Sequence, residues 1–331
     1  MMASWPHIGD DSRAGMSVRS STITDVGDIP LARHCGPCRA TPLRRYPFLL
    51  QTSALDLSGL LLQLGHSTPL AVIGSVPPTF AWLLLPLAGA DSVLLRGQAA
   101  EPHAVAAFGA GAEYELATRR DASWGLVALP MADIGPVLSP PRRSAMRRPG
   151  AAAWLHAEPG AWARAAALMQ DVAEVMAQDP SVFEVEEARR SLRASVLDAS
   201  QDLLAVRTGK VCCRPPDTAM PSLRRIVRTA DDYLTADPAR AVDPGQVAVA
   251  LGISEARLRS AFLAVLGVSA ARYLMVRRLV LARAALRSPD CRPEPIERTA
   301  ATHGFWNLRR FERAYRTMFG ETPAACWPRG H

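Results

Sequence analysis

Lysine is almost absent from this sequence, and cysteine and aromatic residues are sparse. Lys210 is the only lysine among 38 basic residues, so nearly all positive charge is carried by arginine. Six cysteines in 331 residues are too few for a disulfide-stapled scaffold. Charged residues make up 21% of the chain and hydrophobic residues 49%, which excludes the composition of a disordered polypeptide. The length favours two globular domains.

Neither a secretory signal nor a membrane-spanning helix is evident. Residues 1–20 contain no apolar core region of the kind that a signal peptide needs. The stretch between Asp56 and Asp91 lacks Asp, Glu, Lys and Arg and is long enough to cross a bilayer. Four prolines and four glycines interrupt it, so as a helix it could not satisfy its backbone in lipid. We therefore expect short buried strands here and a cytoplasmic protein.

The first two thirds of the chain divide into a tail and a mixed domain. Residues 1–45 show no sustained period and are expected to be an irregular tail. Short apolar runs follow, separated by turn residues at intervals near a dozen, which predicts an antiparallel sandwich or barrel. Helical spacing then appears from Pro159 to Asp179 and again from about Val182 to Val206. Together these elements define a domain over residues 46–208.

The second of these helices carries an apolar stripe between charged residues. Such a stripe can pair with a second copy of the chain, or it can pack on the helix's own barrel. The first alternative predicts a homodimer. The stripe consists of Val185, Ala188, Leu192, Val196, Ser200 and Leu203.

The last third of the chain is helical and basic. Residues 209–221 are rich in proline and are expected to be a linker. Residues 222–331 then carry a net charge of +8, whereas residues 1–221 carry −1. Because a guanidinium group suits phosphate oxygens and guanine edges, this imbalance favours an anionic polymer or surface as partner.

A structural unit occurs twice within the basic region. Each copy has a short helix, a glycine turn, a second helix with a capping residue and a closing glycine. Ser254 and Gly267 bound the second helix of the first unit, and Asn307 and Gly320 bound that of the second. This is the helix-turn-helix pattern, and its duplication around one long helix is typical of nucleic-acid binding. The outward-facing residues are Glu255, Ala256, Arg259 and Ser260 in the first unit, and Leu308, Arg309, Arg310 and Arg313 in the second.

Residues 223–328 resemble the DNA-binding domain of AraC/XylS-type transcription regulators. The resemblance rests on Val247 to Leu258 in the first unit, and on Gly304-Phe305-Trp306-Asn307 through Thr322-Pro323 in the second. It implies that two recognition helices enter successive major grooves on one face of DNA. It also implies that the base-reading positions are Ala256, Arg259 and Ser260 in the first unit, and Arg309, Arg310 and Arg313 in the second. The order of strands and then helices in residues 46–208 resembles the cupin-like sensing and dimerisation domains of the same family.

The long helix between the two units departs from that family's pattern. Apolar residues occupy positions where polar residues are common in the family. This difference indicates an additional buried contact, made with the N-terminal domain. The residues concerned are Met275, Val276, Val280 and Leu281.

Cysteine and histidine provide the remaining candidate sites. Cys35 and Cys38 have the Cys-x-x-Cys spacing of a redox site, but their neighbours predict neither the strand nor the helix that such a site needs. With Cys212 and Cys213 they could also offer four thiolates to zinc, although adjacent cysteines chelate one ion awkwardly. His66 and His103 lack metal-site spacing. We expect no catalytic residue, no metal and no cofactor.

The sequence thus predicts an α+β protein: an N-terminal cupin-like β-barrel with two helices, and a C-terminal all-α domain with two helix-turn-helix units joined by a long helix. The predicted function is a sequence-specific, DNA-binding transcription regulator controlled through its N-terminal domain. Double-stranded DNA is the expected partner, with RNA polymerase, a small-molecule effector and a second copy as further ones, and no membrane. The alternatives are a cupin-like enzyme with a helical partner-binding domain, and a cysteine-based redox sensor. Activation and repression are not distinguished.

Overall fold

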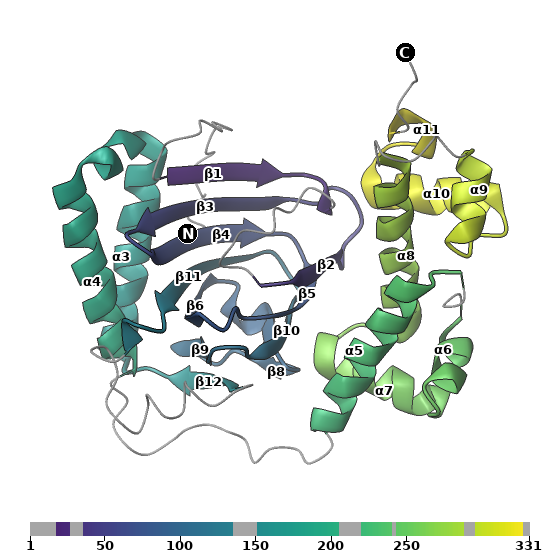
Figure 1. The fold of residues 1–331 in the computed structure, drawn as a ribbon, viewed down its shortest axis with the longest axis horizontal. Helices are drawn as coiled ribbons and strands as arrows, with labels where there is room; N and C mark the ends of the chain where they lie inside the picture. Colours follow the sequence, from purple (N-terminus) through teal and green to yellow (C-terminus); the bar gives the residue numbers. More distant parts are fainter. Residues whose placement is uncertain are drawn as a thin grey trace.

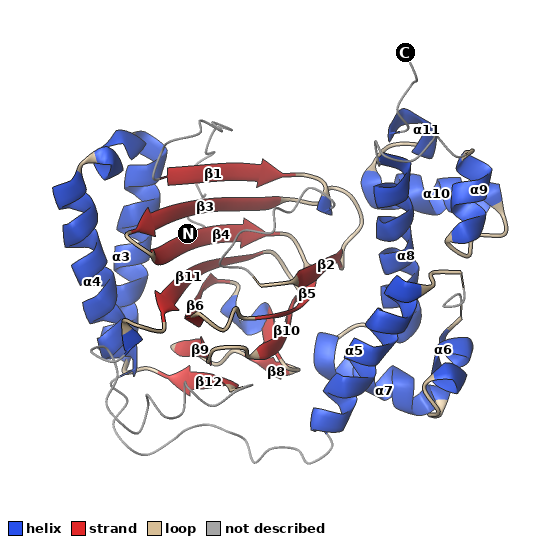
Figure 2. Ribbon diagram, viewed as in Figure 1, coloured by secondary structure: helices blue, strands red, loops and turns tan. Residues whose placement is uncertain are grey.

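The computed structural model describes residues 18–26, 36–134, 151–204, 220–239, 243–287 and 295–326. Within these ranges the N-terminal part is built from two β-sheets followed by two helices, and the C-terminal part is helical (Figures 1 and 2). The fold class is therefore the expected α+β arrangement of two domains. Met220, at the end of the expected linker, already begins the first C-terminal helix.

The strands form one seven-stranded and one five-stranded sheet. The seven-stranded sheet has the order β1-β3-β4-β11-β6-β9-β12, and the five-stranded sheet has the order β2-β5-β10-β7-β8. Every recorded pair of neighbours is antiparallel. The strands are β1 (Val18–Ile23), β2 (Cys38–Pro42), β3 (Leu50–Leu57), β4 (Leu60–Ser67), β5 (Leu70–Ser75), β6 (Phe80–Ala88), β7 (Val93–Leu95), β8 (Gln98–Ala99), β9 (Ala104–Phe108), β10 (Glu113–Thr118), β11 (Ala122–Pro130) and β12 (Ala152–His156).

Both faces of each sheet are covered, which explains the long uncharged stretch in the sequence. Successive side chains of a strand point to opposite faces, so a strand buried on both faces is apolar throughout. In β7, Val93 and Leu95 join the cluster between the two sheets, while Leu94 joins a cluster with the C-terminal helices. Trp82, Phe108, Tyr114 and Trp154 contribute buried aromatic rings to the cluster between the sheets.

Helices α3 (Pro159–Gln178) and α4 (Glu186–Leu204) cover the outer face of the seven-stranded sheet (Figure 1). A 3-10 turn, Pro180–Glu184, joins them, so the second helix begins a few residues later than expected. Leu192 and Val196 of the predicted pairing stripe are buried in the cluster that α4 forms with this sheet. The stripe is therefore used within the chain.

The expectation of an irregular tail over residues 1–45 is wrong for two stretches, which form β1 and β2. β1 has the sequence Val-Arg-Ser-Ser-Thr-Ile and lies at the edge of its sheet, where polar side chains are tolerated. Its register with β3 is marked by hydroxyl contacts from Ser20 to Ser53, at 3.1 Å, and from Ser21 to Thr52, at 2.9 Å. A polar edge strand lacks the apolar alternation that would have revealed it.

The C-terminal helices pack against the outer face of the five-stranded sheet, so the molecule is layered from α3 and α4 through both sheets to these helices (Figure 1). The described helices of this part are α5 (Met220–Ala236), α6 (Pro244–Ala250), α7 (Glu255–Leu266), α8 (Ala270–Arg287), α9 (Ile296–Thr302), α10 (Leu308–Phe319) and α11 (Pro323–Cys326).

In the described ranges, no single helix is long and apolar enough to cross a membrane. Helices α7 and α8 meet the criteria of length and composition only as a pair, and the pair is bent by 73°.

Candidate nucleic-acid interface

The first helix-turn-helix unit consists of α6 and α7. Pro244 occupies the first turn of α6, where its missing N–H is not needed. Ser254 then caps α7, since its hydroxyl accepts a 3.2 Å hydrogen bond from the backbone N–H of Arg257. Leu258 and Phe262 are fully buried on the inner face of α7. The local sequence signals therefore place the outer face of α7 at the protein surface, as predicted.

The second unit, α9 and α10, repeats this construction. Asn307 caps α10 by accepting a 3.0 Å hydrogen bond from the backbone N–H of Arg310. Phe311 and Tyr315 are fully buried on the inner face. Gly320 closes the helix at a φ of 77°, a left-handed conformation that disfavours residues with a Cβ.

All six predicted reading residues are exposed: Ala256, Arg259 and Ser260 on α7, and Arg309, Arg310 and Arg313 on α10. Two of them have recorded partners on their own unit. Arg259 lies 3.2 Å from Glu255 one turn earlier, and both side chains are more than half exposed. The guanidinium group of Arg310 lies 5.8 Å from the ring centre of Trp306. The structure thus presents these residues to solvent on the second helix of each unit.

Helix α8 makes buried polar contacts with α5 and with the second unit. The Tyr273 hydroxyl donates a 2.8 Å hydrogen bond to Asp231 of α5, and Arg277 lies 3.3 Å from the same carboxylate. Burial raises the pKa of Tyr273, which keeps its hydroxyl a donor. At the second unit, Arg278 donates to the Gly304 carbonyl at 3.1 Å. These contacts hold α8 against α5 at one end and against the second unit at the other.

Two of the four apolar residues of α8 that the sequence singles out are buried together with residues of the N-terminal domain. Val276 and Val280 are buried in one cluster with Phe48, Leu50 and Leu70 of the β-domain. Leu281 packs, partly buried, against the neighbouring cluster, and Met275 is 41% exposed. That neighbouring cluster joins Ala71, Ile73, Leu94 and Ala117 of the five-stranded sheet to α5 and α7.

Ion pairs surround this apolar contact. The side chain of Glu115, fully buried on β10, lies 2.6 Å from Arg224 and also pairs with Arg228, both on α5. The pKa of nearby Arg96 is lowered to about 10, because its guanidinium group is buried and lies near Arg224.

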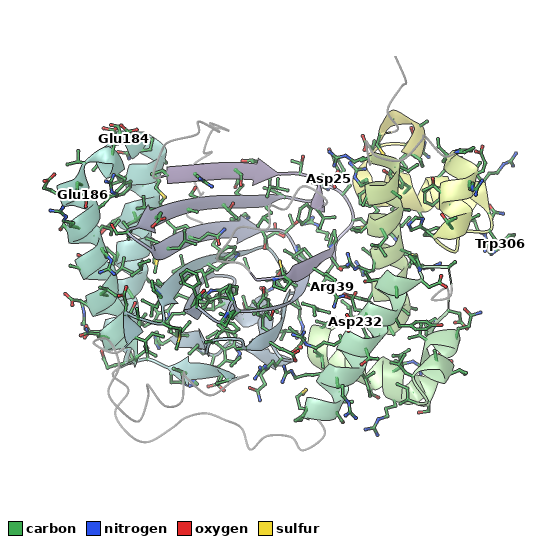
Figure 3. The ribbon with its side chains drawn as sticks, in the orientation of Figure 1. Asp25, Arg39, Glu184, Glu186, Asp232 and Trp306 are labelled. Atoms are coloured by element: carbon green, nitrogen blue, oxygen red, sulfur yellow. The ribbon has the colours of Figure 1, made fainter. Side chains whose placement is uncertain are left out.

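Two further ion-pair groups cross between the domains, and Figure 3 labels Asp25, Arg39 and Asp232 along this boundary. Asp25 lies 2.5 Å from Arg283 and 2.5 Å from Arg287, both on α8. Arg39 of β2 pairs with Asp231 at 2.7 Å and with Asp232 at 2.6 Å. No local sequence pattern links the members of these pairs, so the sequence alone does not predict them.

The cysteine and histidine candidates do not come together in the described part of the chain. Cys35, Cys212 and Cys213 lie outside the described residues. Cys38 is half-buried, and burial raises the pKa of its thiol. His66 contacts the Ser123 hydroxyl at 2.9 Å, and the His103 ring lies 5.6 Å from that of Trp162. Among the described residues, no group of three or more His, Cys, Asp or Glu could hold a metal ion.

A groove beside α10 is a second feature that could not be predicted from the sequence. It lies between α8, α10 and the segment after β2, and it has a volume of about 720 Å³. Six arginines line it, namely Arg44, Arg45, Arg272, Arg278, Arg310 and Arg313. The grouping of Arg44 and Arg45 with Arg310 and Arg313 depends on tertiary packing, which no sequence spacing encodes.

The C-terminal domain thus has two capped helix-turn-helix units joined by one helix. This places it in the class of helix-turn-helix domains, which commonly bind nucleic acid. Comparison with known proteins agrees, since residues 247–326 match the family model described as a helix-turn-helix domain. A segment of 104 residues is 35% identical to the probable thc operon regulatory protein of Rhodococcus erythropolis, covering 31% of each chain. The comparison therefore supports a helix-turn-helix domain over residues 247–326, as the sequence predicts.

Two solved structures show a distant likeness over more of the chain. The AraC-like transcriptional activator CuxR is 18% identical, with 71% of this chain and 81% of that chain covered, at a TM-score of 0.35. ToxT from Vibrio cholerae is 9% identical, with 80% and 97% covered, at a TM-score of 0.27. Both scores are low.

Proposed function

We propose that this protein is a sequence-specific DNA-binding transcription regulator, in which α7 and α10 each read one of two successive major grooves. The observation that carries the proposal is the duplication itself. Each unit has a capped second helix, a buried inner face and an outer face with exposed arginine. An arginine on such a helix can form two hydrogen bonds to guanine or contact phosphate.

The second part of the proposal is control by the N-terminal domain. Apolar clusters and three groups of ion pairs join this domain to α5 and α8, the helices that support both units. Any ligand or partner that altered the β-domain would therefore act directly on the supports of the recognition helices. RNA polymerase and a small-molecule effector belong to this proposal as partners.

A homodimer also belongs to this proposal, but it would form through a different surface from the α4 stripe that the sequence predicts. The stripe around Leu192 and Val196 is buried against the chain's own sheet. Self-association would therefore use another face of the protein, and not this stripe.

The test is a binding selection with the full-length protein and a randomised duplex, followed by titration of the selected site. We expect the selected sequences to contain two conserved segments about one helical turn apart, since the two helices would read successive grooves. The two-helix proposal would be contradicted if the selected sites contained a single conserved segment and only one of the two helices, α7 or α10, affected its recognition when substituted. Absence of any duplex binding would contradict the function itself.

A further inference from the structure

The groove beside α10 contains positive charge that the other residues lining it do not neutralise. Among its described lining residues are six arginines and no aspartate or glutamate. Like charges gathered around one concave surface repel one another, and an anion placed between them relieves this repulsion. The groove therefore fits an anionic partner.

Arg278, in the wall of this groove, strengthens the argument. It is only 6% exposed, and its recorded partners are the Gly304 carbonyl and the ring of Phe305, whose centre lies 4.8 Å away. Neither partner carries a negative charge, and the buried Nε atom has no hydrogen-bond partner. Burial accordingly lowers the pKa of Arg278. A buried cation without a counter-ion adds to the attraction for an anion at the groove.

The groove runs alongside the proposed reading face of α10. Arg310, Arg313 and Thr317 follow one another at helical spacing on α10, and Trp306 lies just before the cap of that helix. All four residues line the groove. Figure 3 shows Trp306 at the outer edge of the helical domain, away from the sheets. A helix in the major groove is flanked by the two phosphate backbones, because that groove is only about 12 Å wide. Duplex DNA seated on α10 would bring one backbone to these arginines.

The N-terminal domain supplies the opposite end of this groove at a fixed position. Leu43 is buried, and its carbonyl accepts a hydrogen bond from Arg272 of α8. Tyr46 packs against Gly320 at the end of α10, where an added Cβ would lie 2.8 Å from the Tyr46 ring. Arg44 and Arg45 lie between these two anchored residues and are exposed. The recorded ion pair of Arg44, with Asp121 at 3.4 Å, is itself about half exposed and therefore weak.

We propose that Arg44 and Arg45 bind backbone phosphates of the DNA that α10 reads, so that the N-terminal domain forms part of the DNA-binding surface. This inference rests on the proposed function and extends it to a domain that carries no helix-turn-helix unit. The contacts are made to phosphate and are independent of base sequence. Any duplex of sufficient length can therefore test them.

The experiment compares two full-length double variants, Arg44→Ala with Arg45→Ala, and Arg164→Ala with Arg190→Ala. The control removes the same charge from α3 and α4, on the far side of the sheets, where Arg164 and Arg190 are exposed and paired with carboxylates. Binding to a mixed-sequence duplex of about three helical turns is titrated over a range of salt concentrations.

We expect the groove variant to bind more weakly at low salt. Its plot of log affinity against log salt should be shallower by about 1.8 units, since each phosphate contact contributes about 0.9. The control variant should have the same affinity and the same salt dependence as the wild type. Equal slopes for the groove variant and the wild type would overturn the proposal. Inorganic phosphate binding that is lost in the groove variant, with duplex affinity unchanged, would place a free anion in the groove and also overturn it. Absence of wild-type binding would instead refute the proposed function, and this inference with it.

Discussion

Arg259 and Arg313 are both exposed on second helices of their units, but their surroundings differ. On α7, Arg259 stands beside the small Ala256 and Ser260 and is the single guanidinium group among the three candidates. On α10, Arg313 has Arg309 and Arg310 as neighbours and also borders the basic groove. Under the proposed function, the first helix would depend on one strong base contact, whereas the second would share its contacts among several arginines.

Arg259→Ala should relax base preference in one half of the DNA site. We expect a cost of roughly 1–3 kcal/mol at the preferred base, the usual value of a two-bond arginine–guanine contact. Titration against the selected site and its single-base variants measures this. Arg225→Ala is a suitable control, because it removes an exposed charge from α5 of the same domain. Equal base preference in Arg259→Ala and the control would show that Arg259 does not read a base.

Arg313→Ala should weaken binding almost equally for all sequences, because the neighbouring arginines retain base contacts while one phosphate contact is lost. The salt dependence should become shallower by about one unit. Titration at several salt concentrations, with Arg225→Ala as the same control, measures the change. A strong sequence dependence of the loss would instead assign Arg313 to base reading.

Glu115→Gln should strongly destabilise the folded protein. The change removes the carboxylate from a fully buried site and leaves Arg224 and Arg228 facing each other without it. Breaking a buried pair in this way costs about 3–5 kcal/mol. Thermal or denaturant unfolding measures the loss. Glu113→Gln is the matched control, since Glu113 is 59% exposed and its removal should cost less than about 1 kcal/mol. Equal stabilities for the two variants would show that the buried pair is not stabilising.

Individual elements were predictable wherever the signal was local. Each of α7 and α10 is marked by a cap, a closing glycine and an apolar spacing that lie within one short segment. The sequence was therefore enough to predict both helices, with Ser254 and Asn307 as their caps. The edge strand β1 was missed because its exposed polar residues show no period. The partners of Glu115 were missed because Arg224 lies 109 residues further along the chain. The groove was missed for the same reason.

The apolar stripe of helix α4 has two possible packing partners, and the sequence does not distinguish them. Its apolar stripe fits either a second chain or its own sheet, because both surfaces exclude water from the same side chains. The structure places Leu192 and Val196 against the seven-stranded sheet. Periodicity alone could not choose between these partners.

Changing Leu192 and Val196 to Glu should therefore unfold the N-terminal domain rather than yield folded monomers. Two unpaired carboxylates would enter a core cluster, and we expect a loss of more than about 4 kcal/mol. Circular dichroism and denaturant unfolding measure the loss. Val185→Glu is the control, because Val185 is 52% exposed and should tolerate the change. A folded, monomeric double variant of a dimeric wild type would restore the pairing hypothesis.

At the scale of the whole molecule, the two domains share their hydrophobic cores. Ile73 and Leu94 of the β-domain pack with α5 and α7, and Phe48 and Leu70 pack with α8. Each domain therefore covers apolar surface of the other. Separation would expose that surface to water, at roughly 25 cal/mol for each Å².

The segment 222–331 should still bind DNA when produced alone, because both helix-turn-helix units and α8 lie within it. Its affinity should fall steeply with salt, as for any domain that contacts phosphates. It should also be less stable than in the full chain, because Val276 and Val280 lose their partners. Duplex titration and thermal unfolding of both proteins test this. Binding that is independent of salt, or equal stability in the two contexts, would contradict it.

The shared core also limits how this protein can be recombined. A chimera that joins this β-domain to the helix-turn-helix domain of a different protein would have to reproduce more than the linker. It would need small or apolar residues opposite Ile73, Leu94 and Leu70, basic residues opposite Glu115 and Asp25, and a carboxylate opposite Arg39. A successful exchange therefore requires the interface residues to be transferred together with α7 and α10. Choosing a junction within the connecting peptide alone would not preserve the packed surfaces.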